Sequence, residues 1–427
     1  MNNFKKIHAA ILAAEEKTHL KWLYIIAAIC MVLNFLLFKI SFDFDTTSYI
    51  SAGEVLMSGH LDSFRTPFYP LLIAVAQRIS EIHYARVVVA VQLVFYFVSI
   101  PYLYRLNAFY IKNKALLFAA SAIYVALPQF SAWALCLMTE CIALSLTIIF
   151  SYYLLRFIKT GSAKASVLYN LILVFMLLLR PSFLYLFAVL AVMHIYLFVK
   201  RRNNILNVAA FLVVIATHLL YCYAYKQEYG VFTTGDVQYN NQRSILNLIH
   251  LVDYSNLDKD YVEKFVVEKE GKTVLDEESL WWSLSPKGKS EVISNSLRKN
   301  WFAYTGYNLR KFFFVSGEPC CIVYPRPRNE LYGRLINNVA QATCTLLMVY
   351  VLFFAYFCVL ARQLWRRRFP ILNIYMWLIV VGMFVTSIFG AGDDWERLVL
   401  PCTPFITIGV FQLVDKLQIR VKDWELG

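Results

Sequence analysis

Long apolar runs recur along the chain and are separated by short polar or basic segments. A transmembrane helix needs about 20 mostly apolar residues to cross the hydrocarbon core of a bilayer. We therefore expect an all-α polytopic membrane protein. Runs of this kind predict about ten membrane-spanning helices, centred on residues 22–40, 84–104, 115–129, 138–155, 166–180, 182–199, 204–224, 338–360, 371–390 and 398–415.

The first long segment between these runs, residues 41–83, carries its own helix signals. Asp45 stands immediately before a predicted helix over residues 46–57, and a second apolar stretch covers residues 68–79. Both helices are too short to span a bilayer. We expect them to lie flat at the membrane interface as part of an outer loop.

The second long segment, residues 226–337, has the composition of a soluble protein. Within it, residues 286–314 have the pattern of one or two amphipathic helices. Loops of this size usually carry function. The chain therefore divides into an N-terminal transmembrane module (1–225), a helical outer loop domain (226–337) and C-terminal transmembrane helices (338–427).

The composition excludes a water-soluble enzyme. Of the 427 residues, 59% are hydrophobic and only 16% are charged, whereas soluble domains are about a quarter charged. The sequence contains no Walker loop and no GxGxxG motif, which argues against direct use of a nucleotide at a cytoplasmic site.

The basic surplus follows the predicted topology. The chain has 41 Lys and Arg against 28 Asp and Glu, a net charge of +13. If the N-terminus is cytoplasmic, the predicted inner segments hold 20 Lys and Arg, and the short outer segments hold four. This asymmetry is the positive-inside pattern. It puts both termini in the cytoplasm and makes the surplus a topology signal; no nucleic-acid partner is expected.

Several charged residues stand at the predicted outer ends of the helices, where topology does not require them. Charges in a membrane protein are costly, so such residues are candidates for function. Carboxylates and guanidinium groups together suit chemistry on an anionic lipid headgroup. The residues are Asp43, Asp45, Arg65, Glu140, Arg180, Asp393, Asp394 and Arg397.

Five of these candidates also have a simpler structural role open to them. These roles are a helix cap for Asp45, a charge on a helix dipole for Glu140, a snorkelling cation for Arg180, a solvated end charge for Asp43, and an ion pair with a neighbouring aspartate for Arg397.

Two stretches of the first outer loop, residues 45–49 (DTTSY) and 65–70 (RTPFYP), resemble a known family. They are similar to the first periplasmic loop of the GT-C class of polyprenyl-phosphate-sugar glycosyltransferases, which includes the protein O-mannosyltransferases and the lipid A aminoarabinose transferase. The similarity continues at residues 138–140 (MTE), at residues 179–182 (LRPS), and at Arg397, which is followed by Pro401 and Pro404.

This resemblance implies a GT-C-like fold with Asp45 as the catalytic base. The family's usual Asp-Glu or Asp-Ser is Asp45-Thr46 here, and the nearby Asp43 leaves open which carboxylate acts. The terminal Arg-Tyr of many members is Arg397-Leu398 here. The implied substrate-binding residues are Asp43, Tyr49, Arg65, Tyr69, Glu140, Arg180 and Arg397.

The chemistry of a polyprenyl-phosphate sugar suits these residue types. Such a donor needs no nucleotide, because the lipid phosphate is already a leaving group. One carboxylate can deprotonate an acceptor hydroxyl while one or two arginines neutralise the departing phosphate. Displacement with a single base implies inversion at the anomeric carbon. No cofactor is required by this scheme, although a divalent cation held by Asp45 and Glu140 stays an open alternative.

We therefore expect an inverting glycosyltransferase in a bacterial inner membrane, with its active site outward. Its partners would be a polyprenyl-phosphate sugar donor, membrane lipids, and a glycan, lipid or protein acceptor. One rival is a transporter of lipid-linked oligosaccharides, which should carry charges near the bilayer midplane and show repeated halves. Another is a glycan polymerase or ligase with a diphosphate-linked donor, which shares the same topology. The donor sugar, its anomer and the acceptor do not follow from the sequence.

Overall fold

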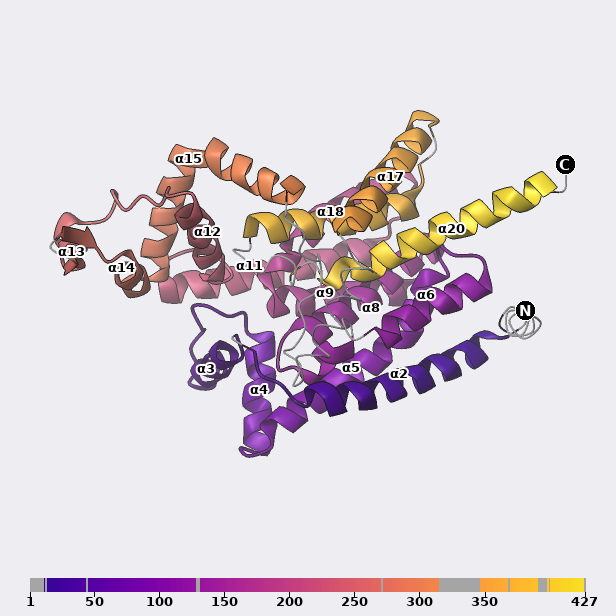
Figure 1. Ribbon diagram of the computed structural model, residues 1–427, viewed down its shortest axis with the longest axis horizontal. Helices are drawn as coiled ribbons and strands as arrows, with labels where there is room; N and C mark the ends of the chain where they lie inside the picture. Colours follow the sequence, from indigo (N-terminus) through magenta and orange to yellow (C-terminus); the bar gives the residue numbers. More distant parts are fainter. Residues whose placement is uncertain are drawn as a thin grey trace.

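The structure, a computed structural model, is a bundle of long helices with a smaller domain at one end (Figure 1). It describes residues 11, 14–43, 45–127, 131–269, 272–314, 346–367, 369–390, 398 and 400–425. Within these ranges, six helical segments are long and apolar enough to cross a membrane. They are Glu16–Leu37 within α2 (Glu16–Phe38), α5 (Tyr84–Asn107), α8 (Glu140–Thr160), η2 with α10 (Pro181–Leu184 and Tyr185–Val199), α11 (Ile205–Tyr229) and α18 (Ile371–Gly390).

The expectation of a helical multi-pass membrane protein is confirmed, but the count of ten spans stays a prediction. All ten predicted runs coincide with helices where the structure describes them. Two of these helices are shorter than a typical span: α6 (Lys114–Ala126) and α9 (Ala163–Leu179). The last runs correspond to α17 (Leu346–Trp365) and to η3 with α20 (Leu400–Cys402 and Thr403–Glu425).

Helix α8 is the centre of the bundle. In the most apolar stretch of α8, 89% of the residues are buried inside the protein. The corresponding share is 22% for α2 and 17% for α11. The sequence accounts for the difference, because α8 is apolar or small on nearly every side and packs against α5 and α9. Its first residue, Glu140, is thereby placed at the end of the most buried element of the bundle.

The two helices expected in the first outer loop are present with the predicted bounds, as α3 (Thr46–Met57) and α4 (Phe68–Ile79). They approach closely because Gly53 has no side chain. A Cβ atom at this position would lie 2.8 Å from the carbonyl oxygen of Pro70. Neither helix belongs to the set of long spans, and their place at the membrane interface stays a prediction.

The second long segment folds around a small core of its own. It contains α12 (Val237–Leu248), α13 (Lys259–Glu263), α14 (Glu277–Ser283) and α15 (Pro286–Phe314). Tyr239, Leu246, Trp281 and Val292 are among its buried residues. Residues 286–314, expected to form one or two amphipathic helices, are α15, which is kinked at Asn300.

One element of this segment departs from the all-α expectation. Strands β1 (Val266–Lys269) and β2 (Lys272–Leu275) form an antiparallel two-stranded sheet in which Val267 pairs with Val274. Valine and threonine favour extended backbone. Residues 266–267 (VV) and 273–274 (TV) are therefore the feature of the sequence that could have predicted the two strands.

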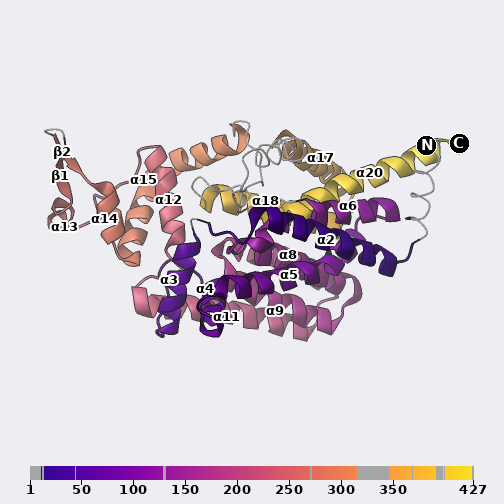
Figure 2. The same cartoon turned by 60° about the horizontal axis from the view of Figure 1, so that its bottom comes forward.

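Both long segments lie at the same end of the bundle (Figures 1 and 2). The backbone N–H of Asp236 and the hydroxyl of Tyr225 each donate to the carbonyl of Ser63, at 2.8 Å. The start of α2 and the end of α20 lie at the opposite end, where Arg105 pairs with Glu16 at 2.8 Å. This grouping agrees with the predicted division into outer and inner segments, while the side of the membrane that each end faces stays a prediction.

Candidate functional site

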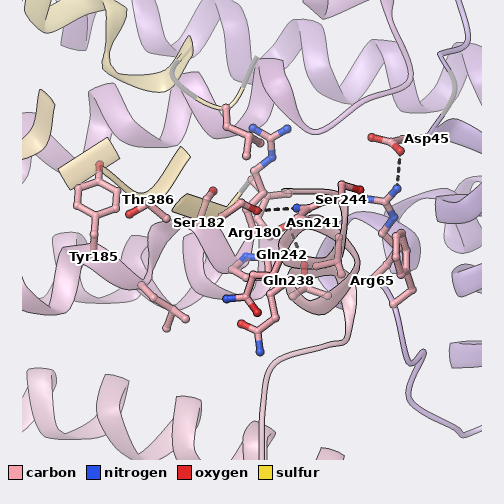
Figure 3. Close-up of a pocket in the computed structure, with 18 of the residues that line it drawn as sticks. Asp45, Arg65, Arg180, Ser182, Tyr185, Gln238, Asn241, Gln242, Ser244 and Thr386 are labelled. Carbon is pink, nitrogen blue, oxygen red and sulfur yellow. Dashed lines mark hydrogen bonds and ion pairs between the residues drawn. The ribbon is translucent and has the colours of Figure 1, made fainter. Parts of the chain in front are cut away.

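A cavity of about 1060 Å³ opens where the first outer loop, the junction of α9 and η2, helix α12 and the end of α18 meet. In Figure 3, Asp45 and Arg65 stand on one side of the view and Tyr185 on the other, with Arg180 and side chains of α12 between them. The cavity therefore has a charged part and a part whose polar groups are uncharged. Its polar lining comprises Asp45, Tyr49, Arg65, Thr66, Arg180, Ser182, Tyr185, Gln238, Asn241, Gln242, Ser244 and Thr386.

Asp45 uses its carboxylate to bind Arg65. It directly precedes α3, but its side chain makes no capping hydrogen bond to that helix. Instead Oδ1 accepts a hydrogen bond of 2.7 Å from Nη2 of Arg65. The geometry therefore does not support the simple helix-cap role for Asp45.

Arg65 is fixed by several neighbours at once. Its Nε donates to the hydroxyl of Ser48 at 2.9 Å, and its guanidinium lies over the ring of Tyr49, 4.3 Å from the ring centre. An arginine held on several sides loses little further entropy when it orients a carboxylate. Arg65 and Tyr49 thus fix the direction of the Asp45 carboxylate at the cavity wall.

Arg180 forms a buried ion pair with Glu140. The residue has an extended backbone (φ −151°, ψ 131°), as expected for a residue that precedes proline. Its Nη2 donates to Oε1 of Glu140 at 2.5 Å, and the two side chains are 7% and 0% exposed. Arg180 therefore does not snorkel towards water. Among the described residues, its buried Nη1 has no hydrogen-bond partner, and the residue lines the cavity.

Hydrogen bonds between the segments next to the four paired residues fix the positions of the two ion pairs relative to each other. The backbone of Ser41 makes two hydrogen bonds of 3.0 Å with residues 135–137, which precede Glu140. The hydroxyl of Thr66 donates to the carbonyl of Leu179 at 2.9 Å, directly before Arg180. Segments that are far apart in the sequence are thus locked together around the cavity.

The other predicted residues take different positions. Tyr69 is fully buried behind Tyr49, with ring centres 5.1 Å apart, and its hydroxyl donates to Gln92 at 2.7 Å. Neither Tyr69 nor Asp43 lines the cavity. Arg397, with its neighbours 393–394, lies outside the described residues. The roles assigned to all these residues stay predictions.

Several lining residues were not expected from the sequence. Gln238, Asn241 and Gln242 follow the i, i+3, i+4 spacing that places side chains on one helix face. This amide stripe was a detectable signal in α12. The stripe faces the first outer loop only because the domain that contains α12 packs against that loop. The spacing of the three amides does not predict this packing.

The described residues do not offer a ligand set for a divalent cation. Within the described ranges, no group of three or more His, Cys, Asp or Glu side chains gathers in a way that could hold a metal. The two carboxylates that were candidates, Asp45 and Glu140, each accept a hydrogen bond from an arginine. Two carboxylates, each already paired with an arginine through one oxygen, are too few ligands for such a cation, so we derive no chemical step through a metal.

Comparisons with known proteins found distant similarity in structure only. No family model and no curated protein sequence matches the chain. The Archaeoglobus fulgidus oligosaccharyltransferase in its apo form aligns with a TM-score of 0.48 at 13% identity, over 95% of this chain and 52% of that chain. Its complex with Zn and sulfate aligns with a TM-score of 0.49 at 14% identity, over 96% and 50%. This chain thus spans about half the length of these structures.

Proposed function

We propose that this chain is an inverting GT-C-class glycosyltransferase of a bacterial inner membrane. It would transfer a sugar from a polyprenyl phosphate to a glycan, lipid or protein acceptor on the outer face. The observation that carries the proposal is the meeting of one carboxylate, Asp45, and two guanidinium groups, Arg65 and Arg180, at one cavity at the end of the bundle. The long apolar helices would place the bundle in the membrane, where the lipid tail of such a donor also lies.

Asp45 is the proposed general base. Its carboxylate accepts the proton of the acceptor hydroxyl while that oxygen attacks the anomeric carbon from the face opposite the phosphate. The bond between the anomeric carbon and the phosphate oxygen breaks, and its electron pair leaves with the phosphate. One displacement of this kind inverts the anomeric configuration. Asp45 is preferred over Asp43 because only Asp45 lines the cavity.

Arg180 is the proposed ligand of the departing phosphate. A guanidinium binds phosphate through charge-assisted hydrogen bonds, and such bonds are strongest where water is excluded. Glu140 holds this guanidinium in place through the hydrogen bond to its Nη2. Glu140 is therefore a positioning residue, and Nη1 of Arg180, which has no hydrogen-bond partner among the described residues, is the donor that we assign to the phosphate.

Arg65 has a second role in this scheme. Because it already binds Asp45, it keeps the carboxylate at the cavity wall before any substrate enters. A phosphate that approaches Arg65 would compete for the same guanidinium and loosen its hold on Asp45. Donor binding and release of the base would then be coupled.

A donor screen with purified protein tests the proposal. The full chain, reconstituted in lipid nanodiscs, is given defined polyprenyl-phosphate sugars or the matching diphosphate-linked sugars together with candidate glycan, lipid and protein acceptors, and release of the lipid phosphate or diphosphate is measured. The proposal requires turnover of at least one monophosphate donor by the wild type and its loss in Asp45→Asn. Turnover of diphosphate donors alone would favour the polymerase or ligase reading, and movement of a lipid-linked glycan across the bilayer without any bond cleavage would favour a transporter.

A further inference from the structure

Helix α12 presents two different faces. Tyr239 and Leu246 point into the core of the outer domain. Gln238, Asn241 and Gln242 occupy the neighbouring face and line the cavity. The outer domain therefore contributes a row of amide side chains to a site whose charged groups come from the transmembrane module.

The three amides differ in how much of their hydrogen-bonding capacity the protein uses. The amide nitrogen of Gln238 donates to the hydroxyl of Thr233 at 2.6 Å, and that of Asn241 donates to the carbonyl of Gly390 at 2.7 Å. Gln242 makes no side-chain hydrogen bond to any residue that the structure describes. Its carbonyl and its NH₂ group thus both remain open to a ligand.

The segment 182–185 adds two hydroxyl groups to the same cavity. The hydroxyl oxygens of Ser182 and Tyr185 are buried, and neither has a hydrogen-bond partner among the described residues. Both residues line the cavity. Buried polar atoms are nearly always satisfied in folded proteins, so hydroxyls left open at a cavity indicate that a bound group or water completes them.

The chemistry of this part of the cavity differs from that of the phosphate site. Among the described residues, the lining contributed by α12, by residues 182–185 and by the end of α18 contains no charged side chain. Amides and hydroxyls offer both donors and acceptors and carry no charge. This is the pairing that a sugar hydroxyl requires. An ammonium group on the sugar would lack a countercharge in this part of the cavity, and a carboxylate could find one only at Arg180, which is assigned to the phosphate.

We propose that Gln242, Ser182 and Tyr185 bind the hydroxyls of an uncharged sugar and thereby select neutral sugars as substrates. This inference rests on the proposed function and names the substrate class of that site. The cavity of about 1060 Å³ is slightly larger than the usual range of about 300–1,000 Å³ for small-molecule sites. It therefore leaves room for a sugar beside the phosphate. The sugar is that of the donor or that of the acceptor, and the experiment separates the two.

Binding to the full-length protein in nanodiscs tests the inference. The lipid probes are undecaprenyl phosphate alone, the same lipid carrying glucose, mannose or galactose, and the lipid carrying galacturonic acid. Free maltotriose, titrated onto protein saturated with undecaprenyl phosphate, probes an acceptor site. The variants are Gln242→Ala and Ser182→Ala, and Asn247→Ala is the matched control, since it removes an amide from the same helix outside the cavity.

We expect at least one neutral hexosyl lipid to bind the wild type more tightly than the bare and galacturonosyl lipids. Gln242→Ala and Ser182→Ala should weaken this binding by about twofold to tenfold, the effect of one neutral hydrogen bond, and leave the bare lipid unaffected. A loss confined to hexosyl lipids assigns the subsite to the donor sugar. A loss confined to maltotriose assigns it to the acceptor.

Three results would overturn the inference. In the first, neutral sugars add no affinity over the bare lipid and maltotriose does not bind. In the second, the two variants weaken the bare lipid as much as the hexosyl lipids, which means that they contact the phosphate. In the third, Asn247→Ala has the same effect as Gln242→Ala. The proposed function would survive all three, whereas failure of the wild type to bind any of the lipid probes would overturn the proposed function itself.

Discussion

Arg180→Met should destabilise the fold and weaken use of the donor, and the two effects should separate when Glu140 is replaced as well. In the wild type the pair is almost fully buried, and its hydrogen bond measures 2.5 Å. The single substitution leaves the Glu140 carboxylate buried without its cation. Breaking a buried ion pair in this way costs about 3–5 kcal/mol.

The double variant, Arg180→Met with Glu140→Met, removes both charges and fills the space with apolar side chains of similar length. Such a replacement is often neutral or stabilising. Most of the stability lost in the single variant should therefore return. The contact with phosphate should not return, because no guanidinium is left. A hydrogen bond to a charged group contributes about 1.5–3 kcal/mol, so kcat/KM for the donor should stay about tenfold to hundredfold below wild type.

The assay pairs thermal unfolding of the detergent-solubilised chain, followed by tryptophan fluorescence, with turnover of a polyprenyl-phosphate sugar that the wild type accepts. Arg78→Met serves as control, because Arg78 is an exposed arginine in the last turn of α4. Turnover of the double variant within twofold of wild type would refute the phosphate role of Arg180. A single variant as stable as the double variant would refute the reasoning about the buried pair.

Three further predictions follow from the same geometry. Asp45→Asn should lower the turnover rate by about 10²–10⁴, the usual effect of removing a general base. Asp43→Asn should lower it far less. If the measured rates rank the other way round, the base is Asp43. A topology reporter inserted after Lys272 should show activity on the extracytoplasmic side, and a cytoplasmic signal would invert the predicted orientation. Asp236→Asn leaves the buried Lys289 without its countercharge and should lower the free energy of unfolding by about 3–5 kcal/mol. Asp253→Asn breaks the half-exposed pair with Lys299 and should lower it by only about 0–1 kcal/mol. Equal shifts of the melting temperature in the two variants would contradict this contrast.

Much of the helical framework follows from local signals. The bounds of α3 and α4 could be predicted because Asp45 and Pro67 stand directly before the two helices, and Ser58 and Ser80 stand directly after them. The end of α9 could be predicted from Pro181, because proline excludes helical backbone at the residue before it. These rules act within a few residues, so they need no knowledge of the fold.

The arrangement of the site could not be predicted in the same way, because it depends on contacts between residues that are far apart in the sequence. Rules that consider only neighbouring residues do not predict such contacts. Asp45 is as good a helix cap as a base when only its neighbours are considered, and the choice depends on Arg65, 20 residues away. Arg180 could equally be a snorkelling cation until Glu140, 40 residues away, is placed beside it. The amides of α12 lay in a segment whose position relative to the first loop is set by tertiary hydrogen bonds such as that from Asp236 to Ser63.

Two ion pairs explain how a membrane protein can hold charged side chains at this cavity. Asp45 neutralises Arg65 and Glu140 neutralises Arg180, so these four residues carry no net charge before a ligand arrives. Arg180 would then donate to a phosphate from a position that Glu140 already fixes, so little reorganisation of this guanidinium would be needed on binding. Asp45, Arg65 and Arg180 line a cavity together with residues of the first long segment and of α12, so a charged headgroup that enters it from the predicted outer side would not carry its charge across the bilayer. That arrangement suits transfer at the membrane surface better than transport through the membrane, which would require charged groups near the midplane.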